Sequence, residues 1–103
     1  MSNNKKISED DLKVLHLVHN NPEISQRGIS KNMGFSLGKV NYCIKALSEI
    51  GFIKLQNFSQ SPNKSGYLYV LTPKGIREKT MLTKRFLQIK QQEYEKLYRY
   101  FND

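Results

Sequence analysis

The segment SLGKVNYC, residues 36–43, holds the side chains with the clearest capacity for chemistry. The amide of Asn41 can pair bidentately with adenine, and the phenol of Tyr42 can contact a thymine methyl group or donate to a phosphate. Gly38 removes bulk where a helix backbone meets DNA, and nearby lysines add charge that phosphates attract. The segment alone fits nucleic-acid reading and an ordinary exposed helix with a glycine near its cap equally well; the preceding short helix, the hairpin and the charge pattern described below favour DNA reading.

Catalytic or metal-binding chemistry has little support. His16 and His19 lie three residues apart, but no cysteine or carboxylate cluster accompanies them as further ligands. We expect both histidines at the surface or at an interface. Cys43 lies beside apolar positions on the helical wheel, which favours a small buried residue over a redox sensor. We therefore predict no enzyme, no cofactor and no metal site.

Helix start and stop signals place residues 36–43 within a larger unit. Serine caps predict helices over about residues 8–20, 25–33 and 36–50. A turn of only Gly34 and Phe35 separates the second helix from the third. Two short helices joined this tightly indicate a helix-turn-helix.

The third predicted helix has a core side and an outer side. Val40, Ile44 and Leu47 recur at helical spacing and should anchor it in the core. The outer side then consists of Gly38, Tyr42, Lys45 and Glu49, with Lys39 and Asn41 on the flanks. An α-helix fits the major groove, and its first turns reach the base edges.

A β-hairpin should follow, because FIKLQNF and YLYVL are rich in strand formers and a polar loop joins them. The loop could reach an adjacent minor groove or its phosphates, although a plain solvated turn remains an alternative. The start of the second helix is placed to grip a phosphate. The residues that we predict to contact DNA are Ser25, Gln26, Arg27, Ser36, Leu37, Gly38, Lys39, Asn41, Tyr42, Lys45, Asn63, Lys64 and Ser65.

A long amphipathic helix of about 28 residues, ~42 Å in length, should begin at Thr72 and Pro73. It would overhang a compact body of about 70 residues and leave its apolar stripe in water, unless the tail folds back or frays. A symmetric pair of tails removes that cost. The predicted dimer interface comprises Val14, Leu17, Leu82, Phe86, Leu87, Tyr94, Leu97, Tyr98 and Phe101.

The charge pattern is consistent with a polyanionic partner. The chain of 103 residues has a formal net charge of +8, and residues 24–72 hold one acid, Glu49, against six bases. A basic protein without a nucleic-acid role is the alternative. One cysteine, a polar start and no apolar run of membrane-spanning length predict a cytoplasmic protein. We divide the chain into a winged helix-turn-helix domain, residues 1–72, and a dimerisation helix, residues 73–103.

Two segments carry a resemblance to a known family. SLGKVNYCIKALSEIGFIK is similar to the recognition helix and first wing strand of the MarR family, with matching positions at Ser36, Val40, Leu47 and Gly51. LTPKG resembles that family's step from the wing into the tail helix. The segments NPEISQR, SLGKVNYC and the tail from residue 71 are also similar to small MarR-type regulators associated with exopolysaccharide gene clusters.

The resemblance implies a mostly α winged helix-turn-helix fold with a small β-hairpin wing and a long C-terminal dimerisation helix. It also implies a homodimer on a pseudo-palindromic operator of double-stranded DNA, usually as a repressor, without indicating a small-molecule effector. The short N-terminus, the single wing lysine and Gly28 depart from the family pattern. A protein–protein adaptor and an RNA-binding module remain the alternatives.

Overall fold

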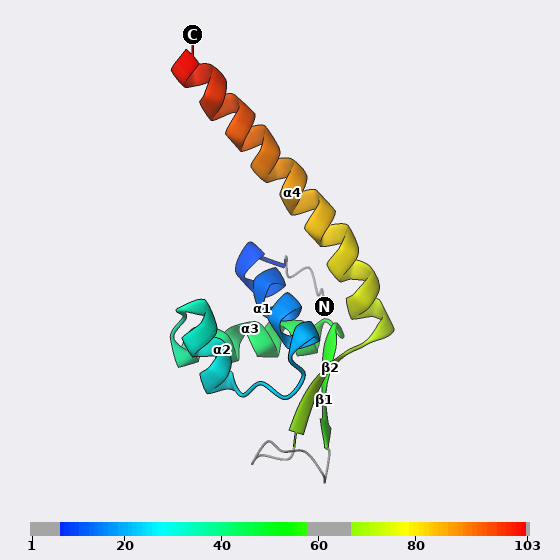
Figure 1. The fold of residues 1–103 in the computed structure, drawn as a ribbon. Coiled ribbons are helices and arrows are strands. Elements are labelled where there is room, and N and C mark those ends of the chain that lie inside the picture. Colours follow the sequence, from blue (N-terminus) through cyan, green and yellow to red (C-terminus); the bar gives the residue numbers. More distant parts are fainter. Residues whose placement is uncertain (1–6, 58–66, 103) are drawn as a thin grey trace.

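The computed structural model describes residues 7–57 and 67–102. Its elements follow the order shown in Figure 1: α1 (Glu9–Asn20), α2 (Gln26–Met33), α3 (Leu37–Glu49), β1 (Ile53–Asn57), β2 (Tyr67–Leu71) and α4 (Pro73–Asn102). The two strands form an antiparallel hairpin. The predicted fold class, mostly α with a small hairpin wing and a long C-terminal helix, is confirmed.

Serine side chains begin the first three helices, as predicted. Ser8 Oγ accepts the backbone N–H of Asp11 at 3.0 Å, and the Asp11 carboxylate accepts the backbone N–H of Ser8 at 3.0 Å. Ser25 and Ser36 likewise accept a backbone N–H from the third residue of α2 and of α3. These bonds satisfy donors that a helix start leaves without an intrahelical partner.

The core lies between α1, α2, α3 and the base of the hairpin. It comprises Leu12, Val14, Leu15, Val18, Ile29, Val40, Cys43, Ile44, Leu47, Phe52, Ile53 and Leu71. Val14 is 0% exposed within a single chain, so its predicted place in a dimer interface is wrong. The reason is that α1 packs against α2, α3, β2 and α4 of its own chain, which covers both of its apolar faces. Leu17, Leu82 and Phe86 are partly buried against the same core.

The hairpin and α4 meet at a close backbone approach. Thr72 donates its backbone N–H to the carbonyl of Phe52 at 3.0 Å, and its hydroxyl accepts the backbone N–H of Gly75 at 3.0 Å. A Cβ atom on Gly75 would lie 2.1 Å from the Phe52 carbonyl oxygen. Only glycine therefore lets the first turn of α4 lie this close to the start of the wing.

Helix α4 continues far beyond the body of the molecule (Figure 1). With α4 included, the chain has extents of 60 × 33 × 22 Å. We define the outer α4 surface as Leu87, Tyr94, Leu97, Tyr98 and Phe101, all of which are exposed. Tyr94 and Phe101 are 66% and 75% exposed. The overhang predicted from helix length is thus present. No helix in the described part of the chain is long and apolar enough to cross a membrane.

The inner half of α4 is attached to α1 through His16. Lys79 Nζ lies 3.3 Å from His16 Nδ1, and Thr83 Oγ1 lies 2.9 Å from Nε2. An ammonium can only donate, so Nδ1 accepts and Nε2 donates, which describes a neutral imidazole. Burial, and then the positive charge of Lys79, hold the pKa of His16 below its usual value. The histidine lies at a helix interface, as the sequence predicted.

Candidate nucleic-acid interface

The turn between α2 and α3 fixes how α3 is presented. Gly34 ends α2 in the left-handed conformation, with φ of 72°, and donates its backbone N–H to Ser30. On α3, Val40, Ile44 and Leu47 are buried, as predicted. We define the α3 outer face as the exposed residues in the first three turns of the helix: Leu37, Gly38, Lys39, Asn41, Tyr42 and Lys45. Glu49, which the sequence placed on the same side, is exposed at the far end of the helix.

A chain of side-chain hydrogen bonds ties the α3 outer face to two other elements. Asn41 Nδ2 donates to Gln26 Oε1 at 3.4 Å, and Gln26 Nε2 donates to the hydroxyl of Tyr69 at 3.4 Å. These three residues come from α3, α2 and β2. Gln26, which the sequence assigned to phosphate gripping, therefore bridges the predicted base-reading residue and the wing.

Lys39 has a partner within the protein. Its ammonium lies 2.6 Å from the carboxylate of Asp10 on α1 and 4.2 Å from the centroid of the Phe35 ring. The hydrogen bond that Lys39 donates to the Asp10 carboxylate raises the pKa of Lys39. A phosphate that approached this lysine would compete with Asp10, so Lys39 offers less net charge to DNA than the sequence suggested.

The middle of the α3 outer face combines open space with a large aromatic side chain. A Cβ atom added to Gly38 would meet no atom within 4 Å, so the glycine leaves room at the surface and fills no internal gap. Tyr42 is 61% exposed, and Lys45 is exposed one helical turn after Asn41. The major groove of DNA admits a single α-helix, and polar side chains on such a face can reach the base edges there.

The part of the chain that contains α1, α2 and α3 matches a known family. Residues 8–54 match the family described as winged helix-turn-helix DNA-binding. No curated protein matches the chain. Among solved structures, FabT from Streptococcus pneumoniae in complex with DNA is similar at 25% identity and a TM-score of 0.63, over 89% of this chain and 62% of that one.

Two further solved structures share the same architecture. The PcaV transcriptional regulator from Streptomyces coelicolor is similar at 20% identity and a TM-score of 0.70, over 84% of this chain and 62% of that one. MarR from Staphylococcus aureus is similar at 19% identity and a TM-score of 0.65, over 87% of this chain and 59% of that one. The chain has a winged helix-turn-helix fold that it shares with these structures.

This winged helix-turn-helix protein spans about three fifths of the length of the structures that it matches. The resemblance to the MarR family that its recognition helix and LTPKG step suggested is confirmed at the level of the fold. The family model that matches residues 8–54 is described by DNA binding and not by a catalytic activity.

The structure brings together most of the DNA-contacting residues that the sequence suggested. Ser25 and Arg27 are exposed at the start of α2, and Gln26 is half-buried beside them. The α2 start is joined to the α3 outer face through Gln26 and Asn41. The loop residues Asn63, Lys64 and Ser65 lie outside the described residues.

Sequence reasoning missed Tyr69 and Asp10. Both act across long sequence separations, Tyr69 on Gln26 and Asp10 on Lys39. Alternation along β2 signals only that Tyr69 shares a face with Leu71, and the acids of α1 read as helix-start residues. Neither pattern indicates which residue Tyr69 or Asp10 contacts.

Cys43 belongs to the core of the winged helix-turn-helix. It is 2% exposed, and burial raises the pKa of its thiol to about 12, with Asp11 as a further cause. The thiol is therefore protonated at neutral pH and a poor nucleophile. Among the described residues, no group of three or more histidine, cysteine or acidic side chains could hold a metal ion.

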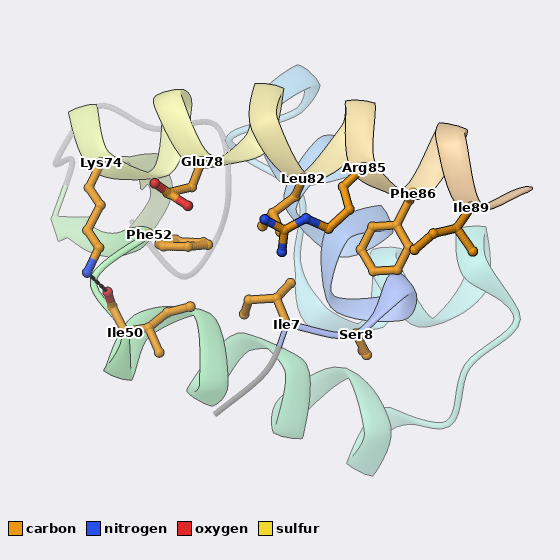
Figure 2. A pocket seen from close by; sticks show the side chains of 10 residues that line it. All are labelled: Ile7, Ser8, Ile50, Phe52, Lys74, Glu78, Leu82, Arg85, Phe86 and Ile89. Carbon is orange, nitrogen blue, oxygen red and sulfur yellow. Dashed lines mark hydrogen bonds between the residues drawn. The ribbon is translucent and has the colours of Figure 1, made fainter. Parts of the chain in front are cut away.

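A pocket of 780 Å³ lies away from the α3 outer face, between α4, the end of α3 and the start of the hairpin. Figure 2 shows Leu82, Phe86 and Ile89 of α4 along one side, while Ile50 comes from the end of α3. Lys74 donates to the carbonyl of Ile50 at 3.0 Å across one end of it. None of its lining residues belongs to the predicted DNA-contacting set, so the pocket plays no part in the interface described here.

Proposed function

We propose that this protein is a homodimeric regulator that binds double-stranded DNA and reads its sequence with α3. The observation that carries the proposal is the α3 outer face, which is exposed and carries an asparagine joined by hydrogen bonds to the half-buried Gln26 and, through it, to Tyr69. An asparagine held this way can pair with adenine in the major groove.

The distribution of charge supports a duplex partner. The formal net charge is +8, and Arg27 and Lys45 are exposed beside the predicted reading residues. Exposed cations release counterions when they meet phosphates, which gives binding a steep dependence on salt. The free N–H groups at the starts of α2 and α3 add further positive potential toward phosphates.

The outer α4 surface supports a second copy as the partner in the dimer. Its leucines and aromatic rings are exposed in the single chain, and burying each is worth about 1.5 to 3 kcal/mol. A twofold pair of α4 helices would cover them and present two α3 helices. A twofold protein pairs with a pseudo-palindromic operator, because each half-site meets the same helix.

The regulatory consequence belongs to the same proposal. A dimer seated on an operator that overlaps a promoter blocks transcription, so we propose a repressor, and the cytoplasmic location expected from the sequence follows from this role. The similarity of three segments to exopolysaccharide-associated regulators leads us to propose genes of that class as targets. Sequencing genomic DNA recovered with the protein tests both points.

The DNA-reading proposal is tested by selecting duplexes from a randomised pool and measuring binding by fluorescence anisotropy. Asn41→Ala and Tyr42→Ala should each weaken binding to the selected duplex by about 5- to 100-fold, and binding to a random duplex far less. Lys45→Ala is the matched control on α3, because loss of a phosphate contact should weaken both duplexes equally.

The same titration separates the alternatives. Equal losses on both duplexes for Asn41→Ala and Tyr42→Ala would contradict base reading by α3. Preference for single-stranded RNA over duplex DNA would favour the RNA-binding reading. Binding that hardly changes with salt would favour a protein–protein adaptor.

A further inference from the structure

The hydroxyl of Tyr69 belongs to β2, outside the predicted DNA-contacting set, yet it is joined to Asn41 through Gln26 by two hydrogen bonds. We propose that Tyr69 is a positioning residue for sequence recognition, acting on Asn41 through the amide of Gln26. The inference rests on the proposed function, in which Asn41 reads a base. It concerns a residue of the wing strand, outside the set of residues expected to touch DNA.

Tyr69 is the anchored end of this series of two hydrogen bonds. Side chains alternate along a strand, so Tyr69 shares the face of Leu71, which is buried in the core. The Tyr69 ring packs against that core, and its backbone N–H donates to the carbonyl of Pro22 at 3.0 Å. Both the ring and the backbone are thus fixed by the body of the protein.

Asn41 is the other end of this series of hydrogen bonds, and it is exposed on α3. Gln26 lies between them, half-buried in the first turn of α2, with Oε1 accepting from Asn41 and Nε2 donating to Tyr69. Because both ends of its amide are engaged, Gln26 transmits the fixed position of the phenol to the asparagine. Rotation of Asn41 away from this orientation breaks a bond.

The bond leaves Asn41 able to read a base. Its Nδ2 carries two hydrogens, of which one is given to Gln26, and its Oδ1 keeps its acceptor sites. Adenine requires one donor and one acceptor from the amide, which are the groups that remain. Holding the amide in place before DNA arrives reduces the entropy lost on binding, which is the general advantage of preorganisation.

The test uses Tyr69→Phe in the full chain, because phenylalanine keeps the ring that packs on the core and removes only the hydroxyl. Affinity for the selected duplex should fall about three- to tenfold, while affinity for a random duplex stays within about twofold. Duplexes selected by the variant should show a weaker base preference at one position in each half-site. Tyr100→Phe, which removes an exposed hydroxyl on α4 outside the outer α4 surface, is the matched control and should change neither.

A double-mutant cycle shows whether the hydroxyl acts through Asn41. In an Asn41→Ala background, Tyr69→Phe should have almost no further effect on the selected duplex. If the two losses instead multiply, or if Tyr69→Phe is silent while Asn41→Ala removes the preference, the positioning inference is wrong and the proposed function stands. If Asn41→Ala itself leaves the preference intact, the base-reading role fails and the inference fails with it.

Discussion

The α3 outer face and the outer α4 surface are both exposed, but their side chains differ in kind. On α3, Asn41 and Lys39 each have a hydrogen-bond or ion-pair partner on another element of the chain. On the overhanging part of α4, ring contacts join neighbours of the same helix, Tyr94 to Tyr98 with ring centroids 6.2 Å apart and Tyr100 to Phe101 with centroids 5.6 Å apart.

This difference indicates what each surface is for. Polar side chains that other residues of the protein hold by hydrogen bonds can face water at little cost in free energy. Their orientation is already set for a ligand that matches them. Leucine and aromatic side chains gain free energy only when a partner covers them. We infer that the first surface is complete within one chain, whereas the second requires another copy.

The largest effect should come from charging the outer α4 surface. Tyr94→Glu combined with Leu97→Glu should weaken dimerisation at least about 100-fold, because two apolar contacts per chain are lost at a twofold interface. Sedimentation velocity across a concentration series measures this. The control, Gln88→Glu with Gln92→Glu, adds the same charge on the opposite side of the helix and should remain dimeric. Dissociation by both pairs alike would show a general charge effect and contradict the assignment of this surface.

Two glycines allow a comparison between a position that packing requires, Gly75, and a position that faces open space, Gly38. Gly75→Ala should lower the free energy of unfolding by about 2 to 3 kcal/mol, because its methyl group would overlap the Phe52 carbonyl. Gly38→Ala has open space and should raise that free energy by up to about 1 kcal/mol. Urea unfolding measures both values.

The same Gly38→Ala protein should nevertheless bind the selected duplex about tenfold more weakly, a change of about 1.4 kcal/mol, because the methyl group occupies space proposed for DNA. Anisotropy titration measures this. Unchanged affinity in the more stable variant would show that the α3 backbone does not approach the duplex.

A smaller effect should follow from releasing Lys39. Asp10→Asn removes the carboxylate 2.6 Å from its ammonium, so duplex affinity should rise about two- to fivefold, the range of an exposed ion pair. The slope of log affinity against log salt should steepen by about one charge. Glu95→Gln makes the same charge change on outer α4 and serves as the control. Equal gains from the two variants would mean that only net charge matters.

The smallest effect should be a pH dependence at the α1–α4 contact. The pKa of His16 is held below its usual value in the folded protein, so the unfolded chain binds more protons as the pH falls below about 6.5. Stability contributed by neutral His16 is therefore present above that pH and decreases as the pH drops toward the folded-state pKa.

His16→Gln should remove this part of the pH dependence, whereas His19→Gln, which changes an exposed histidine on the same helix, should keep it. Urea unfolding at a series of pH values compares the three proteins. A wild-type profile that matches that of His16→Gln would contradict the neutral state inferred from the bonds to Lys79 and Thr83.

The fold was predictable because its signals are local. Serine caps, the glycine stops and the 3.6-residue repeat identified the helices, and Val40, Ile44 and Leu47 oriented α3. The interactions that connect elements were less accessible to sequence reasoning. Neither the Asp10–Lys39 ion pair nor the chain from Tyr69 to Asn41 has a local pattern, because each pairing is set by tertiary packing.

Val14 shows a related limit of sequence reasoning. Its helix has apolar residues over more than half of its circumference, which correctly indicated two buried faces. The pattern could not show whether the second face is covered by the same chain or by a second copy. The structure shows that the same chain covers it.

The division between the two surfaces is tested most directly by hydrogen–deuterium exchange of the full protein with and without its selected duplex, at a concentration where it is dimeric. We predict new protection at the start of α2 and over the first three turns of α3, with no change over residues 91–102. Protection of residues 91–102 with α3 unaffected would contradict the account, because it would place DNA on α4 and leave the α3 outer face without its proposed partner.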